Sequence, residues 1–163
     1  MNYNKIRKMD IADGEGIRVS IFFQGCDFHC KNCFNEETWD WNEGLEFTDS
    51  EIDKIIDLAK ADHIAGLSIL GGEAMHPKNI EGATNLAKRF KEVYPNKDIW
   101  SWSGFLFDQI KDKEIFNYLD VLVDGQFVDE LRNPNLKWRG SSNQRVIDVK
   151  KTIKKGDIVL YED

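Results

Sequence analysis

The chain has 163 residues, of which 41% are hydrophobic and 12% aromatic, enough apolar material to fill the core of one domain. Acidic residues outnumber basic ones by 29 to 22, and the resulting net charge of −7 gives no electrostatic support for a nucleic-acid partner. No apolar run approaches the roughly 18 residues of a membrane span, and the first residues lack the apolar stretch of a signal peptide. We therefore expect one cytoplasmic domain over residues 1–163, with no membrane partner.

In chain order, the spacing of apolar residues changes repeatedly between the period of a strand and that of a helix. The clearest helix start is Thr48, which forms a capping-box pattern with Glu51. The predicted elements are a strand over 17–23, a helix over about 49–60, a strand over 66–70, a helix over about 83–94, a strand over 98–102, a weak helical stretch to about 118, a strand over 120–123, a polar loop over 129–143, and late strands over 145–149 and 157–161.

Alternating strands and helices predict a parallel sheet with helices packed outside it, a fold in which function gathers where the strands end. Polar or glycine-rich stretches follow four of the predicted strands, namely the cysteine loop, Gly71-Gly72-Glu73, Ser103-Gly104 and Asp124-Gly125. We expect them to meet at one mouth. Because a full eight-unit barrel takes about 250 residues, the predicted fold class is α/β, an open, partial (βα) barrel.

The chain has three cysteines, Cys26, Cys30 and Cys33, in a C-x3-C-x2-C run within a loop over 24–36. A disulfide would leave one thiol unpaired, and the chain lacks the cysteine density of a secreted domain. Zinc is the stronger alternative, since His29 or His63 could supply a fourth ligand. Closely spaced cysteines on one loop favour an iron-sulfur cluster, and three thiolates leave one iron free to bind something else.

The second candidate motif is Gly71-Gly72-Glu73. Two glycines after a strand let the backbone approach a ligand closely, and the carboxylate that follows can pair with an ammonium group. Alone, this tripeptide is more often an ordinary turn. It becomes much more specific when it follows the cysteine run.

Together these motifs resemble the radical S-adenosylmethionine (radical SAM) superfamily. Within it, the chain is similar to the glycyl radical enzyme activases, in particular those of anaerobic ribonucleoside-triphosphate reductase. The stretches that carry this closer resemblance are Asp13–Arg18, Gly71–Pro77, Val121–Phe127 and Trp138–Arg145. The resemblance extends to about Val149, and residues 150–163 carry no signature.

The resemblance implies a set of site residues. Cys26, Cys30 and Cys33 would hold three irons of a [4Fe-4S] cluster, and the amino and carboxylate groups of S-adenosylmethionine would chelate the fourth. The residues expected to contact that cofactor are Asn32, Cys33 and Phe34 beside the adenine, Gly71, Gly72 and Glu73 at the methionine ammonium, and Ser103 and Asp124 at neighbouring strand ends. No further catalytic residue is expected.

The resemblance also implies an activity. An electron from the reduced cluster would cleave S-adenosylmethionine, and the resulting 5′-deoxyadenosyl radical would remove a hydrogen atom from a glycine of anaerobic ribonucleoside-triphosphate reductase. Reduced flavodoxin or a similar donor would supply the electron. Two alternatives remain open: an activase of another glycyl radical enzyme, such as pyruvate formate-lyase, and a zinc-binding module without catalysis.

Overall fold

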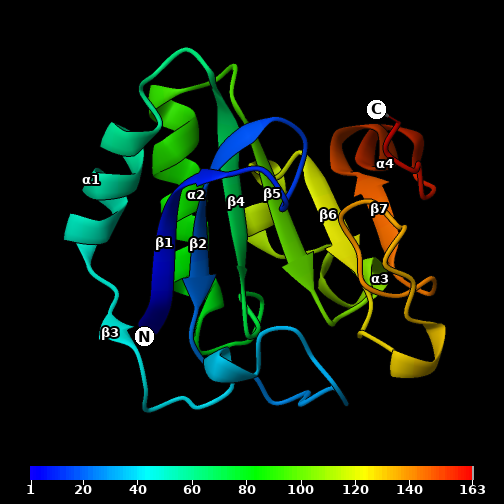
Figure 1. The fold of residues 1–163 in the computed structure, drawn as a ribbon. Helices are drawn as coiled ribbons and strands as arrows, with labels where there is room; N and C mark the ends of the chain where they lie inside the picture. Colours follow the sequence, from blue (N-terminus) through cyan, green and yellow to red (C-terminus); the bar gives the residue numbers. More distant parts are fainter. Residues whose placement is uncertain (163) are drawn as a thin grey trace.

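The computed structural model describes residues 1–162, which form a single seven-stranded sheet with helices packed against it (Figure 1). The strands are β1 (Asn2–Asp10), β2 (Ile17–Phe23), β3 (Leu45–Glu46), β4 (Ile64–Gly71), β5 (Asp98–Ser103), β6 (Val121–Asp124) and β7 (Arg145–Asp148). The helices are α1 (Asp49–Leu58), α2 (Ile80–Val93), α3 (Phe107–Ile110) and α4 (Val149–Lys155), with 3-10 turns at Glu36–Thr38, Glu114–Asn117 and Asp129–Leu131.

The sheet order is β3-β1-β2-β4-β5-β6-β7. The four central strands, from β2 to β6, run parallel, whereas β1, β3 and β7 pair antiparallel at the two sides. Parallel neighbours require a crossover, which α1, α2 and the α3 region provide. The predicted fold class, an open partial barrel of the α/β type, is confirmed, with antiparallel strands added at its edges.

The two faces of the sheet differ in chemistry. Alternate residues of the central strands, such as Ile21, Leu67 and Ile99, belong to the hydrophobic core that α1 and α2 share. The intervening residues point to the other face, where buried polar groups such as Arg18 and Ser68 lie. The helices therefore cover one face, and the other is free to form a pocket.

The carboxyl ends of the parallel strands all lie at one end of the sheet, at the bottom of the view in Figure 1. The light-blue cysteine segment lies there, and the yellow-to-orange segment that joins β6 to β7 reaches the same end. Helix α4 lies at the opposite end. The fold thus gathers at one end the loops that carry the predicted site residues.

Most predicted elements are confirmed, including the weak helical stretch after β5, which forms α3 and a 3-10 turn. One predicted strand was wrong, and α4, β1 and β3 were not predicted. Residues 157–161 form no strand but a single bridge to β7, and the helix α4 precedes them, with Asp148 as its N-cap and left-handed Gly156 at its end. Strand β1 was not predicted, because its sequence is largely polar and does not alternate.

The C-terminal segment, which carries no sequence signature, covers the aromatic end of the free face. The ring of Tyr161 lies 5.0 Å from that of Trp100 and 5.8 Å from that of Trp138. Its hydroxyl donates a hydrogen bond to the Glu15 carboxylate. These contacts tie the end of the chain to the β1–β2 hairpin. No helix among residues 1–162 combines the length and the hydropathy needed to cross a bilayer.

Arg18 ties three strands together on the face away from the helices. Its side chain is fully buried, and its Nε donates to Ser68 Oγ at 2.7 Å, while Nη2 donates to the Leu67 carbonyl at 2.9 Å. Nη1 lies 2.7 Å from Asp98 Oδ1 as an ion pair, and the guanidinium sits 5.5 Å from the Trp100 ring centre. A buried guanidinium with these partners crosslinks β2, β4 and β5.

Replacing Arg18 with methionine should destabilise the fold by about 3 kcal/mol, because it leaves a carboxylate and a carbonyl without their buried partner. Urea unfolding of the metal-free protein measures the loss. Arg89→Met is the matched control, since Arg89 pairs with Asp53 at the surface and its loss should cost about 0–1 kcal/mol. Equal losses in the two variants would contradict the role of the Arg18 network.

Candidate functional site

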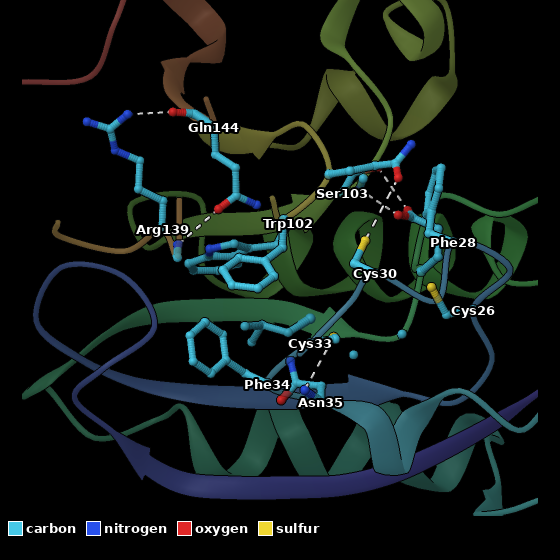
Figure 2. Close-up of a pocket in the computed structure, with 18 of the residues that line it drawn as sticks. Cys26, Phe28, Cys30, Cys33, Phe34, Asn35, Trp102, Ser103, Arg139 and Gln144 are labelled. Carbon is cyan, nitrogen blue, oxygen red and sulfur yellow. Dashed lines mark hydrogen bonds between the residues drawn. The ribbon is translucent and has the colours of Figure 1, made fainter. Parts of the chain in front are cut away.

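A pocket of about 530 Å³ opens at the carboxyl ends of the parallel strands (Figure 2). Eight of the residues singled out in the sequence line it: Cys26, Cys30, Cys33, Phe34, Gly71, Gly72, Glu73 and Ser103. In the view of Figure 2, Trp102 lies between the labelled Cys30 and Arg139. Four separate loops of the sequence thus meet around a single space.

Cys26 is placed by backbone contacts at the end of β2. The preceding residue, Gly25, has φ +104°, and its N–H donates to the Thr38 carbonyl at 2.6 Å. The Cys26 N–H donates to the Trp39 carbonyl at 3.2 Å, and the Glu73 N–H donates to the Gly25 carbonyl at 2.8 Å. The start of the cysteine loop therefore lies between the segment of Thr38 and Trp39, which follows that loop, and the Gly-Gly-Glu loop.

The glycine pair is required by the close approach of β4 to the end of β2. A Cβ at Gly71, whose φ is +132°, would lie 2.2 Å from the Phe23 carbonyl oxygen. A Cβ at Gly72 would lie 2.3 Å from the carbonyl oxygen of Gly25. No side chain fits at either position without moving backbone. The two glycines thus allow Glu73 to lie next to the start of the cysteine loop.

Glu73 is a buried hub, with 1% of its surface exposed. One carboxylate oxygen accepts from the Gly104 N–H at 2.7 Å, and the other accepts from the Met75 N–H and the Ser103 hydroxyl, both at 2.9 Å. Burial raises the pKa of Glu73 to about 7, although these hydrogen bonds act in the opposite direction. The side chain joins the loops after β4 and β5, and an approaching cation would favour its ionised form.

The three thiols have the chemistry of a site for an iron-sulfur cluster. Cys26 is buried, whereas Cys30 and Cys33 are partly exposed. Burial raises the pKa of the Cys26 and Cys30 thiols, and the neighbouring Cys33 raises that of Cys30 further. Three thiolates held this close therefore need a cationic centre.

The three thiols are the ligand type that an iron-sulfur cluster takes. Among residues 1–162, no three histidine, cysteine, aspartate or glutamate side chains are arranged to hold one metal ion. The three thiols nevertheless line one pocket, and thiolates are the ligands that iron-sulfur clusters take. The chain has no fourth cysteine, so Cys26, Cys30 and Cys33 would hold three irons and leave one for another ligand.

Two predicted residues, Asn32 and Asp124, lie outside the pocket lining. Asn32 is exposed, with φ +57°, and its amide donates to Asp129 Oδ2 at 3.1 Å. Asp124 is fully buried, accepts from the Arg145 guanidinium at 3.0 and 2.6 Å, and accepts from the Phe107 N–H at 2.9 Å. Their contacts with a cofactor stay predictions, and both side chains already have protein partners.

Sequence reasoning did not identify the floor of the pocket, and it singled out parts of one wall, Val121–Phe127 and Trp138–Arg145, only through resemblance. The additional lining residues include Phe22, Leu70, Trp102, Gln126, Phe127, Arg132, Trp138, Arg139 and Gln144. For the floor, a signal existed: Trp100 and Trp102 alternate with Ile99 and Ser101 in β5, which places the tryptophans on the face away from the core. The wall comes from a segment whose regular structure is limited to one 3-10 turn and one isolated bridge, which the spacing of apolar residues does not describe.

That wall is the segment 125–144, and it is held in place by contacts on two sides. On the pocket side, the Phe127 ring lies 5.1 Å from that of Phe34, and Arg132 sits 5.0 Å from the Phe34 ring centre. On the sheet side, the Trp102 indole donates to the Trp138 carbonyl at 2.7 Å. Trp138 has φ +64°, which is rare for a bulky residue. An unusual backbone held by specific contacts at a pocket points to a functional wall.

Comparison with known proteins agrees with this geometry. Residues 12–147 match the family model described as a 4Fe-4S single cluster domain. Together with the open sheet and the three-thiol pocket, this match defines an iron-sulfur domain of the radical SAM type.

Similar proteins of known name show which family within the radical SAM type the chain resembles. The chain is 41% identical over 148 residues to the anaerobic ribonucleoside-triphosphate reductase-activating protein of Vibrio cholerae, covering 88% of this chain and 96% of the relative. It is 39% identical over 150 residues to the protein of that name from Escherichia coli K12, covering 90% and 97%, and 38% identical over 146 residues to that of enterobacteria phage T4, covering 90% and 93%. The chain belongs to the family of anaerobic ribonucleoside-triphosphate reductase-activating proteins. The family confirms the expected cofactors, a [4Fe-4S] cluster and S-adenosylmethionine.

The raised pKa of Glu73 predicts a pH dependence of stability. The unfolded chain releases the Glu73 proton near pH 4.3, whereas the folded chain keeps it until about pH 7. Between these values the folded state binds more protons, so its stability falls as pH rises, by at most about 1.4 kcal/mol per pH unit. Urea unfolding of the metal-free protein at several pH values, compared with Glu73→Gln, isolates this contribution. Parallel curves for the two proteins would contradict it.

Proposed function

We propose that this protein activates an anaerobic ribonucleoside-triphosphate reductase by generating a glycyl radical on it, through reductive cleavage of S-adenosylmethionine at a [4Fe-4S] cluster. The observation that supports this most directly is the pocket in which Cys26, Cys30 and Cys33 face the loop of Glu73. We propose that residues 1–163 form a single radical SAM domain, with 24–36 as its cluster loop.

When bound, the cluster and S-adenosylmethionine supply a one-electron cleavage that ends in removal of a hydrogen atom from a glycine Cα. The chain's own residues would bind the cluster and S-adenosylmethionine and orient them. The three thiolates would hold three irons, and Glu73 would receive the methionine ammonium beside the backbone of Gly71 and Gly72. Because Glu73 is buried and held by three donors, its carboxylate cannot turn away from that place.

The floor of the pocket would protect a reactive radical. Phe22 and Leu70 are buried and Trp102 is partly buried, and all three present apolar surface beside the cysteines. Apolar walls keep water out and make stray proton and electron transfers less favourable. These residues are expected to bind no cofactor group by hydrogen bonds; their contribution is exclusion of water.

A protein substrate must reach the pocket, and two of the pocket's sides carry charged residues. Arg7 and Asp13 line the pocket from the β1–β2 hairpin, and Arg132 and Arg139 line it from the segment 125–144. A chain segment that carries a glycine would enter between these sides. The Trp138–Arg145 stretch, which resembles the reductase activases most closely, belongs to the second side.

Two finer points of the proposal concern the environment. The chain would receive its electron from reduced flavodoxin or a similar donor. It would work in the cytoplasm, because its three cysteines are unpaired thiols and such thiols persist in a reducing compartment.

Anaerobic reconstitution with iron and sulfide should give about four irons per chain. The reduced protein, mixed with S-adenosylmethionine and an anaerobic ribonucleoside-triphosphate reductase, should then produce a glycyl radical doublet in the electron paramagnetic resonance spectrum of the reductase. Pyruvate formate-lyase serves as the control substrate and should remain silent. A doublet on pyruvate formate-lyase alone would overturn the choice of partner, and a colourless protein with one zinc would overturn the whole proposal.

Cys30→Ala should abolish cleavage of S-adenosylmethionine, because two thiolates cannot hold a stable cluster. The measurement is the yield of 5′-deoxyadenosine under reducing, oxygen-free conditions. Circular dichroism of the metal-free variant, expected to match the parent, shows that the fold is intact. Cleavage at the parent rate would rule out the three-thiolate cluster.

A further inference from the structure

Asp27 directly follows the first cluster cysteine but does not line the pocket. Its side chain is exposed to solvent, and each carboxylate oxygen has a partner from a different segment. Trp41 Nε1 donates to Oδ1 at 2.9 Å, and His76 Nε2 lies 2.7 Å from Oδ2. The first partner follows the cysteine loop, and the second belongs to the loop after β4. One carboxylate therefore joins three segments.

The direction of the His76 contact follows from the other ring nitrogen. The backbone N–H of Lys78 donates to His76 Nδ1 at 3.1 Å, so Nδ1 is an acceptor. The ring proton then lies on Nε2, which donates to Asp27. The imidazole is itself only 15% exposed, and its ring centre lies 4.5 Å from that of Trp41. The three side chains form a closed bracket.

The bracket bears on the backbone just before Cys26. The Trp41 ring lies so close to Gly25 that a Cβ there would come within 2.1 Å of it. Lys78 Nζ covers the same ring at 4.9 Å from its centre. The Trp41 indole N–H is held by Asp27, and its ring packs directly against the turn that precedes Cys26. A residue larger than glycine does not fit at position 25 against this ring.

The other two cysteines lack comparable support. Both Cys30 and Cys33 are partly exposed, and the Cys30 thiol makes a long contact of 3.9 Å with Gln126 Oε1 beside a backbone hydrogen bond from Phe127. Cys33 Sγ accepts from the Asn35 N–H at 3.4 Å, within its own loop. Cys26 is therefore the thiol that the protein holds most firmly without any metal.

We propose that Asp27 is a positioning residue, which through Trp41 and His76 fixes Cys26 in its cluster-binding place before the cluster is assembled. The inference rests on the proposed cluster, but it depends neither on S-adenosylmethionine nor on the reductase. It assigns to Asp27 a role in cluster retention rather than in catalysis.

Two variants and one control test the bracket. Asp27→Ala removes both contacts. Asp27→Asn keeps the shape, but if its oxygen still accepts from Trp41, its amide N–H faces the Nε2–H of His76, so one contact is lost. Glu36→Ala is the matched control, because it removes one exposed carboxylate from the last position of the same loop, and that carboxylate has no hydrogen bond or ion pair within residues 1–162.

The first measurement is amide hydrogen exchange of the metal-free proteins. In Asp27→Ala, exchange over residues 24–41 should be about fivefold faster, as expected for the loss of one or two stabilising hydrogen bonds. Exchange in β4 and β5 should not change, and Glu36→Ala should match the parent throughout. Unchanged exchange over 24–41 would overturn the proposal. Acceleration across the whole sheet would overturn it too, because the role would then be one of global stability.

The second measurement is the rate at which a chelator removes iron from the reconstituted proteins without oxygen. The rate should be highest for Asp27→Ala, intermediate for Asp27→Asn, and equal in the parent and Glu36→Ala. Equal rates in all four would overturn the positioning role while leaving the proposed function intact. If the parent itself takes up no iron, the proposed function fails, and hydrogen exchange alone then decides whether Asp27 holds the loop.

Discussion

The close approach of two parallel strands at their carboxyl ends is the constraint on which the site depends. Phe23 pairs with Gly71 in the register of β2 and β4, and the backbone beyond them stays in contact from Gly72 to Gly25. Side chains larger than hydrogen would separate these strand ends. Since the cysteine loop follows one strand and Glu73 follows the other, their mutual distance is fixed by backbone packing. The start of the cysteine loop and Glu73 are therefore held as firmly as the strand ends that carry them.

Burial of the ionised Glu73 carboxylate lowers the stability of the free protein but strengthens the binding of a cationic ligand. Removing a carboxylate from water favours its neutral form, which is why its pKa rises to about 7 despite three hydrogen bonds. The same low-polarity surroundings strengthen the attraction between the ionised carboxylate and a nearby cation. A free protein that carries this group is less stable near neutral pH, and a ligand with an ammonium group would recover the difference. This arrangement suits selection of a positively charged ligand.

The parts of the structure that follow from local sequence could be predicted, and the parts that depend on distant contacts could not. The capping box of Thr48 and Glu51 and the strand 17–23 are local patterns, and both form as expected. Strand β1 is a largely polar neighbour of β2, and its pairing with β2, not its own pattern, makes it a strand. The Asp27–His76 contact joins residues 49 positions apart, and nothing in either loop indicates it. The site motifs could be recognised in the sequence because few other residues can replace a cysteine as a cluster ligand or a glycine at a close backbone approach.

The two halves of the cysteine loop are supported by different parts of the fold. Its beginning, at Cys26, is fixed by the sheet ends and the Asp27 bracket. Its end, at Phe34, packs on Phe127 and Arg132 of the segment 125–144. That segment also lines the side of the pocket along which a protein substrate would enter under the proposed function. A partner that binds to this segment would contact the residues that support Phe34. Substrate entry and the geometry of the cluster loop would therefore be coupled through the segment 125–144.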